Sequence, residues 1–417
     1  MLKGYTKAEK SWMLYDWANS AFATIIAAII LPIFFKEIAH QNGVSDVDAT
    51  AFWGYATSCG TLICAVLAPF MGTLGDFKGM KKRLFTFFML LGVISSALLA
   101  FTGNWKALLV LYVLGTLGFN GSCVYYDSFL LDVTTEERMD RVSTLGYGLG
   151  YIGGSTIPLV LSLLLIQFGD AIGIGTMLAT RISFLLTAGW WLVFTLPMLR
   201  YVHQKHGIDP ERNIVLHTLR NVKDTCCMIL KNKSVVFFII AYFFYIDGVG
   251  TIIHMATVFG DSCGLGSMDM MVVLLVVQIV AFPFAILYGK LAEKVGSRTM
   301  ILTGIATYIV VCFVAFRLST LRDFLILAVL VGTAQGGIQA LSRSFFGKLV
   351  PQESASEYFG FFDVFGKFSA VIGPTLFGLV AQATGVSRYG ILPVLGMFIL
   401  GGVIMAFVVP KNIQRIH

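Results

Sequence analysis

Long apolar segments, separated by short polar connections, fill almost the whole chain of 417 residues. Each segment is close to the ~20 residues that an α-helix needs to cross the hydrocarbon core of a bilayer. The pattern predicts twelve membrane-spanning helices, at residues 12–35, 50–73, 84–102, 107–129, 142–166, 177–199, 234–258, 268–288, 299–317, 323–346, 357–381 and 390–409. The expected fold class is therefore an all-α membrane protein whose surface contacts the lipid bilayer.

Two short loops of the first half of the chain return in the second half. Residues 72–83 read GTLGDFKGMKKR and residues 289–298 read GKLAEKVGSR, at an offset of 217 residues. Two segments of the capping-box form Ser/Thr-x-x-Glu, TTEE at 134–137 and SASE at 354–357, lie 220 residues apart. Parallel repeats of six spans are a known construction of membrane transporters. We therefore predict two six-helix halves, residues 1–200 and 234–417, joined by a cytoplasmic linker at 201–233.

The linker contains apolar residues at steps of three and four positions, which predicts an amphipathic helix on the membrane surface. These residues are Val215, Leu219, Val222, Cys226 and Ile229. A simple tether with a solvated basic face and a regulatory helix both fit this pattern.

Charge is scarce and unevenly placed. The chain is 57% hydrophobic and 13% charged, which excludes a water-soluble globular protein. With a cytoplasmic N-terminus, 23 Lys and Arg residues face the inside, six face the outside, and Lys367 lies within a span. The positive-inside rule then places both termini in the cytoplasm. In a prokaryote we expect the protein in the plasma membrane. The net charge of +7 therefore reflects basic residues in the cytoplasmic loops and does not indicate nucleic-acid binding. We expect a monomer with no nucleic-acid partner.

Ionisable residues deep in a membrane are expensive and are functional candidates by default. Asp247 is the deepest carboxylate, and His254 lies two turns away on the same helix face, so the two are placed to line one proton path. Asp16 and Asn19 share a face of the first span and suit either substrate contact or an inner gate. A buried carboxylate satisfied by polar neighbours is the structural alternative for Asp247.

Two further pairs combine opposite charges. Asp127 and Arg343 occupy matching inner ends of spans four and ten and are placed to pair across a cytoplasmic gate. Asp363 and Lys367 are four apart on span eleven, so they form either a structural ion pair or one that substrate or proton binding breaks. Gln335 and Gln339 add neutral hydrogen-bonding groups to one face of span ten.

Motifs of nucleotide-binding proteins and of enzymes are either absent or lie inside a predicted membrane span. The GxGxxG match at residues 148–153 lies inside a predicted span with no strand before it, so it does not indicate a nucleotide site. The sequence has no HExxH, GxSxG or GxxxxGK[ST] segment, and its seven cysteines show no ligand spacing. We therefore expect no enzyme activity, cofactor or metal site.

The repeated loops resemble motif A of the major facilitator superfamily, Gly-x-x-x-Asp-x-x-Gly followed by basic residues. The matching positions are Gly72, Asp76, Gly79, Lys82 and Arg83 in the first copy and Gly289, Glu293, Lys294, Gly296 and Arg298 in the second. Phe77 and Met80 stand where basic residues are usual. The resemblance implies that these positions belong to a gate between two six-helix halves.

Four segments resemble the vacuole-effluxer branch of that superfamily, which is related to fungal vacuolar amino-acid exporters. They read YDWANSAF at 15–22, YIDGVGT at 245–251, GGIQALSRSFFGKLVP at 336–351 and EYFGFFDVFGKFSAVIGP at 357–374. The resemblance implies a secondary transporter that exports a small organic solute, an amino acid or similar compound, by alternating access. The Arg-containing pattern usual in span four is replaced by NGSCVYY at 120–126, which argues against a standard proton relay.

Two alternatives stay open at this point: a lipid-like or amphipathic substrate, and a non-transporting membrane receptor or scaffold. If transport is coupled to protons, Asp247 is the expected carrier. We also expect Asp76 to face the first turn of span eleven and Glu293 the first turn of span five, because a helix N-terminus favours a carboxylate.

Overall fold

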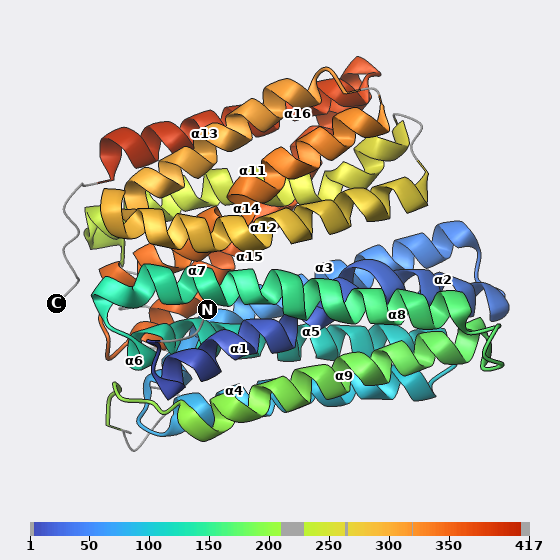
Figure 1. Cartoon of the computed structure of the whole chain (residues 1–417), viewed down its shortest axis with the longest axis horizontal. Coiled ribbons are helices and arrows are strands. Elements are labelled where there is room, and N and C mark those ends of the chain that lie inside the picture. The colour runs from blue at the N-terminus through green and yellow to red at the C-terminus, as the bar shows by residue number, and fades with distance from the viewer. Residues whose placement is uncertain (1–3, 210–228, 263–265, 319, 410–417) are drawn as a thin grey trace.

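The computed structural model describes residues 4–209, 229–262, 266–318 and 320–409 (Figure 1). Twelve helical segments in these ranges are long and apolar enough to cross a membrane, which confirms the predicted number of spans and the all-α class. The first and fifth spans, Lys7–Gln41 and Glu136–Phe168, are longer than the apolar windows that predicted them. Polar first turns extend these helices beyond the apolar stretch.

The first six spans form the N-terminal half. Its helices are α1 (Lys7–Ala21), α2 (Ile30–Gln41), α3 (Asp46–Asp76), α4 (Met80–Leu98), α5 (Trp105–Ser128), α6 (Leu130–Val133), α7 (Met139–Leu149), α8 (Ile157–Phe168) and α9 (Gly175–Tyr201). π-Helical stretches, Phe22–Ile29 and Gly150–Thr156, join α1 to α2 and α7 to α8. Such stretches are frequent at functional sites.

The last six spans form the C-terminal half. Its helices are α11 (Lys233–Ser262), α12 (Ser267–Val295), α13 (Ser297–Ala315), α14 (Leu321–Leu349), α15 (Ala355–Thr384) and α16 (Ile391–Val403), the last of which continues into a π-helical turn, Ile404–Val408. The helices run roughly parallel to one another, and α7 lies beside α12 where the two halves meet (Figure 1). The halves also meet where α3 packs on α15, α7 on α14 and α5 on α15.

Glycines allow neighbouring helices to approach closely. A side chain on Gly118 of α5 would clash with the backbone of Gly92 in α4 and would lie 2.7 Å from the Phe88 carbonyl oxygen. Gly92 itself leaves room for the ring of Trp191 in α9, a fully buried residue. Close backbone approach through small residues is the usual means of packing helices in membranes.

The beginning of the linker packs against the end of the bundle at which α1 begins and α9 ends, called the inner end from here on. Gln204 accepts hydrogen bonds from the backbone N–H groups of Gly79 and Lys81, at 2.9 and 3.3 Å. Asp132 forms a buried ion pair with Lys81 at 2.8 Å and also accepts from the backbone of Lys205 and His206. The amphipathic helix predicted near residues 215–229 lies mainly outside the described residues.

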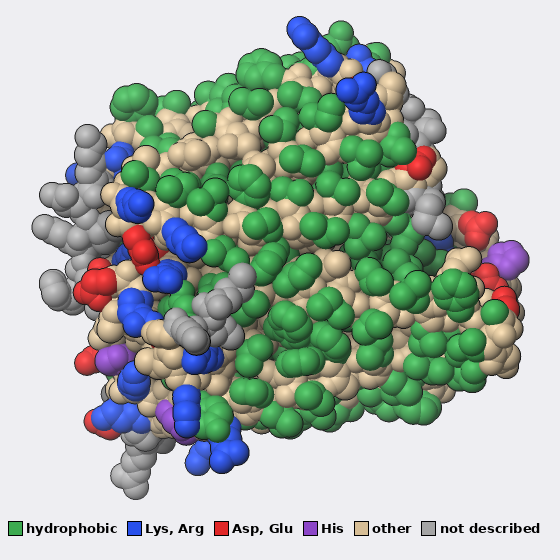
Figure 2. Space-filling view, in the orientation of Figure 1, with side chains coloured by type: hydrophobic (Ala, Val, Ile, Leu, Met, Phe, Trp, Pro, Cys, Tyr) green, Lys and Arg blue, Asp and Glu red, His purple; other side chains and the backbone are tan. Residues whose placement is uncertain are grey.

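Hydrophobic side chains cover most of the face seen in Figure 2, and many Lys and Arg side chains gather at the inner end. This arrangement fits a bundle embedded in lipid, with its basic loops on one side. The cytoplasmic orientation of that side stays a prediction.

The glycine contacts predict unequal effects of adding one methyl group. Gly118→Ala should destabilise the protein by ~1–3 kcal/mol, because the new Cβ meets backbone atoms that cannot turn aside. Gly189→Ala, also in a helix interior, should be neutral or slightly stabilising, because nothing lies within 4 Å of its new Cβ. Thermal unfolding of the purified variants checks this, and equal melting temperatures would contradict it.

Candidate functional site

Asp76, the acidic residue of the first motif copy, contacts the first turn of α15 in the opposite half. Its buried carboxylate accepts hydrogen bonds from the backbone N–H groups of Ser356 at 2.8 Å and Glu357 at 2.9 Å. The expected contact is confirmed, and its cause is the set of unpaired N–H groups and the positive dipole at a helix N-terminus. Asp76 thereby takes the Glu357 N–H that a capping box would use.

Neither predicted capping box forms. Ser354 stands at the N-cap of α15 but makes no side-chain cap bond. The Thr134 hydroxyl donates instead to Glu9 at 2.8 Å, and Glu9 forms a capping box with Thr6 at the start of α1. Both segments do mark helix starts, and at the start of α15 the Asp76 carboxylate takes the place of the cap.

The motif glycines are required for two different reasons. Side chains on Gly72 or Gly289 would clash with Ser356 or Thr144 of the opposite half, so each glycine lies in a contact between the halves. Gly79 and Gly296 have open surroundings but positive φ angles, 78° and 87°, which other residues rarely adopt.

The second motif copy makes a different contact from the first. Glu293 faces the start of the fifth span, as expected, but it meets the exposed Arg141 side chain at 3.8 Å and accepts no hydrogen bond from the N–H groups of that helix end among the described residues. Arg298 donates to the carbonyls of Met405 and Ala406 within its own half. The exposed Arg83 of the first copy lines a shallow surface hollow with Lys82 and His203.

Asp140, at the start of α7, supplies the buried contact on this side. Its carboxylate accepts hydrogen bonds of 2.6 Å from the hydroxyls of Ser297 and Ser344 and from the ammonium of Lys348. All three donors belong to the C-terminal half. Asp140 therefore joins the two halves beside α7, as Asp76 joins them at the start of α15.

Arg343 connects the halves at a deeper level. Its guanidinium, 3% exposed, donates to Asp127 at 2.9 Å, to Asp16 at 3.3 Å, and to the hydroxyl and carbonyl of Ser143 at 3.0 and 3.1 Å. The predicted pairing of Asp127 with Arg343 is thus confirmed, and Asp16 joins it. Aromatic rings enclose the cation, with centroids 4.6, 5.2 and 4.5 Å away for Trp12, Tyr126 and Tyr147.

Tyr126 and Asn19 tie α1 to α5 around this cluster. The Tyr126 hydroxyl donates to Asp16 at 2.7 Å, while the Trp12 indole N–H donates to the Tyr126 carbonyl at 2.7 Å. Asn19 is buried, and its amide donates to the thiol of Cys123 at 3.4 Å. Asp16 therefore lies in the cluster that joins the two halves, a position that suits the inner gate, one of its two predicted roles.

Asp363 and Lys367 form the predicted ion pair on one face of α15. Lys367 is twelve residues past the start of this 30-residue helix, so it lies ~18 Å along an axis of ~45 Å. This helix packs against α3 and α5 of the opposite half. The Asp363 and Lys367 side chains are 27% and 10% exposed, but the two atoms that face each other, Oδ2 and Nζ, are buried.

Asp247 and His254 have separate environments. Asp247 is 1% exposed, and its Oδ1 accepts from the Gly373 N–H at 2.9 Å, whereas its Oδ2 has no hydrogen-bond partner among the described residues. His254, two turns further along α11, is exposed, so the predicted path would run from the buried Asp247 to an exposed side chain. Gln335 is buried beside a cavity inside the C-terminal half, and Gln339 is half-buried one turn further along α14.

Sequence reasoning missed several groups at the inner end. These are Lys81, Asp132, Asp140, Ser143, Ser297, Ser344 and Lys348, together with the rings around Arg343. Most lie near helix ends, where charged residues are common, and nothing in their spacing distinguishes a cross-half contact from a solvated helix end. The neighbouring Tyr125 and Tyr126 were the available signal, since paired aromatics beside an acid are unusual in a span.

Comparisons with known proteins agree with this geometry. The chain is 47% identical over 412 residues to the uncharacterised MFS-type transporter YxiO of Bacillus subtilis (strain 168), covering 98% of this chain and 96% of YxiO. It is 24% identical over 450 residues to autophagy-related protein 22 of Eremothecium gossypii, covering 91% and 86% of the two chains. These relatives support a transporter and not an enzyme.

Solved structures show the same fold. The proton:xylose symporter XylE bound to 6-bromo-6-deoxy-D-glucose superimposes with a TM-score of 0.76 at 12% identity, covering 98% of this chain and 96% of XylE. The transporter FucP in the outward conformation gives 0.71 at 12% identity, covering 98% and 99%. The model of the family described as "Vacuole effluxer Atg22 like" matches residues 6–415. The chain has the major facilitator fold and belongs to the vacuole effluxer Atg22-like family.

Proposed function

We propose that the chain exports a small zwitterionic solute, an amino acid or a similar compound, from the cytoplasm by alternating access. The observation that carries this proposal is the Asp363–Lys367 pair on α15, where an anion and a cation lie one helical turn apart at the boundary between the halves. An amino acid carries the same two charges close together. It can therefore replace the partner of each side chain without leaving a buried charge unpaired.

The surroundings of the pair favour a solute site over a purely structural ion pair. The helix that carries the pair, α15, packs against α3 and α5 of the opposite half, and the Tyr242 hydroxyl of α11 would lie 3.3 Å from a Cβ added to Gly366. Asp127 and Arg343 lie further toward the inner end. The Asp363–Lys367 pair is therefore deeper in the bundle than these proposed gate residues. A solute at the pair would meet residues of both halves, as alternating access requires.

A counterflow measurement in proteoliposomes tests the solute class. Wild-type protein should exchange amino acids but not neutral sugars, and Asp363→Asn or Lys367→Met should slow the exchange at least ~10-fold, because each removes one charge that the solute needs. Lys78→Met breaks the exposed Lys78–Asp209 pair and is the matched control, with unchanged exchange expected. Exchange of sugars alone, or full activity in both site variants, would refute the proposal.

We further propose that Asp247 carries the proton if export is proton-coupled. Asp247 is buried, pairs with no Lys or Arg among the described residues, and contacts Gly373, next to Pro374 in the middle of α15. An isolated ionised carboxylate is costly to bury, so loss or gain of a proton would alter how Asp247 binds α15. His254, exposed two turns further along α11, is the outward end of the proposed route.

Asp247→Asn keeps the size and the acceptor for Gly373 but cannot release a proton. It should abolish accumulation of solute driven by a pH gradient while leaving some solute-for-solute exchange, since exchange moves no net proton. Asp209→Asn, at an exposed position, is the control. Proton-driven accumulation by Asp247→Asn with the wild-type pH dependence would show that Asp247 is only structural.

A further inference from the structure

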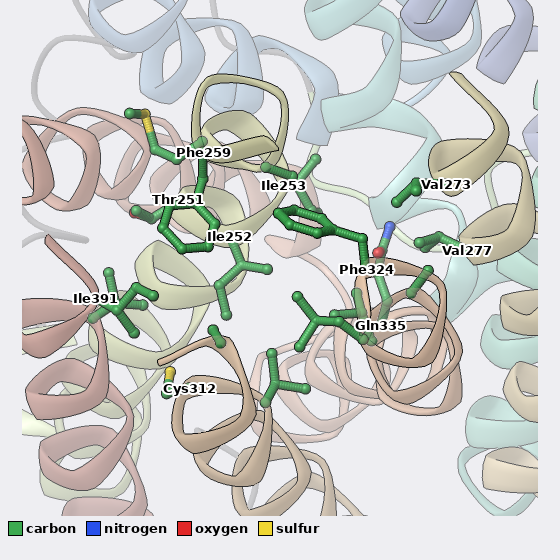
Figure 3. A pocket seen from close by; sticks show the side chains of 18 of the residues that line it. Thr251, Ile252, Ile253, Phe259, Val273, Val277, Cys312, Phe324, Gln335 and Ile391 are labelled. Atoms are coloured by element: carbon green, nitrogen blue, oxygen red, sulfur yellow. The ribbon is translucent and has the colours of Figure 1, made fainter. Parts of the chain in front are cut away.

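The C-terminal half contains a partly enclosed cavity of about 110 Å³ that is separate from the Asp363–Lys367 pair. Side chains of α11, α12, α13, α14, α15 and α16 line it, so it lies within the six-helix half (Figure 3). Phe324, Val273 and Ile252 are typical of its mainly apolar wall. Cavities of this size class lined by aliphatic and aromatic side chains stay dry and accept a single small ring.

Two amide oxygens interrupt the apolar wall. Gln335 of α14 is 6% exposed and Gln278 comes from α12, and the Oε1 atoms of both are buried without a hydrogen-bond partner among the described residues. The two helices touch nearby, because a side chain on Gly332 would lie 3.0 Å from the Val277 carbonyl. A buried acceptor without a donor is unfavourable, so these oxygens are satisfied when something in the cavity supplies an N–H or O–H group.

The other polar groups of the wall do not supply that donor. The Thr251 hydroxyl already donates to the Asp247 carbonyl oxygen at 2.7 Å, and the Cys312 thiol is a weak donor. A single water would satisfy only part of its own hydrogen bonding against so apolar a wall. A ligand with an apolar body and one donor matches the lining better.

Gln335 also connects the cavity to the interface between the halves. Gln335 is followed by Gly336, which lies against Tyr151 in the π-helical stretch of the N-terminal half. The Tyr151 ring packs against the neighbouring Gly336, where a side chain would lie 2.7 Å from Cε2. A molecule held by Gln335 therefore lies next to the contact between Gly336 and Tyr151. This contact must change when the two halves move relative to each other.

We propose that this cavity binds a small, ring-sized apolar molecule carrying one O–H or N–H donor, which the amide oxygens of Gln335 and Gln278 accept, and that its occupancy is coupled to closure of the inner end. The ligand is a regulator that differs from the zwitterionic solute proposed for the central pair. The regulator site and the solute site are independent proposals, and either one can be correct without the other.

Ligand-observed fluorine NMR on the full chain in nanodiscs tests the site with 4-fluorophenol and the donor-free fluorobenzene. Wild-type protein should bind 4-fluorophenol about 2- to 10-fold more tightly than fluorobenzene. Gln335→Leu should remove this preference, whereas Gln167→Leu, the same change at an exposed position in the other half, should keep it. Equal affinities in wild-type protein, or an unchanged preference in Gln335→Leu, would overturn the proposal.

Two further variants separate the site from partition into lipid and test the coupling. Ala328→Phe fills the cavity and should abolish saturable binding of both probes, with its melting temperature as the check on folding. Arg343→Gln removes bonds that join the halves at the inner end. It should lower the affinity for 4-fluorophenol by about 2-fold or more, because coupling between two sites is reciprocal. Saturable binding retained by a folded Ala328→Phe protein would place the probe elsewhere, and unchanged affinity in Arg343→Gln would refute the coupling.

Discussion

The buried guanidinium of Arg343 is the interaction on which the closed inner end depends. It satisfies two carboxylates of the opposite half, Asp127 and Asp16, and two oxygen atoms of Ser143, while three aromatic rings exclude water around it. A buried cation of this kind is stable only with its partners present, and the partners are stable only with the cation. The halves therefore either meet with all these bonds made or separate far enough for water to replace them. An interaction with two such states suits a gate.

The inner end shows a division of charge between the halves. The acids that cross the interface, the buried Asp16, Asp76 and Asp140 and the half-buried Asp127, belong to the N-terminal half. Their partners in the C-terminal half are Arg343, Lys348, serine hydroxyls and the N-terminus of α15. The exposed Arg141–Glu293 pair has the opposite polarity and lies at the periphery. The internal repeat thus has one architecture but has diverged in chemistry, since Asp76 binds a helix end and Glu293 does not.

Sequence reasoning reached the fold and part of the site for physical reasons that differ between residues. Hydrophobic length defined the twelve spans, because the bilayer sets one scale for every helix. Pairs with fixed helical spacing, such as Asp363 and Lys367, were predictable, as was Asp127 with Arg343 through the repeat offset. The neighbours of Asp247 were not, because helix periodicity gives a face but not the helix that packs on it. Asp140 was missed since a carboxylate near a helix start is usually solvated.

The central claim is that Arg343 holds the halves together at the inner end. Distance measurements between spin labels at Lys78 and Lys294, exposed positions in the two halves, test it most directly in a cysteine-depleted background. The account predicts a clear shift toward longer distances in Arg343→Gln, because Asp127 and Asp16 lose their shared cation. Arg298→Gln, which loses bonds only within its own half, should keep the wild-type distribution. A wild-type distribution in Arg343→Gln would contradict the account.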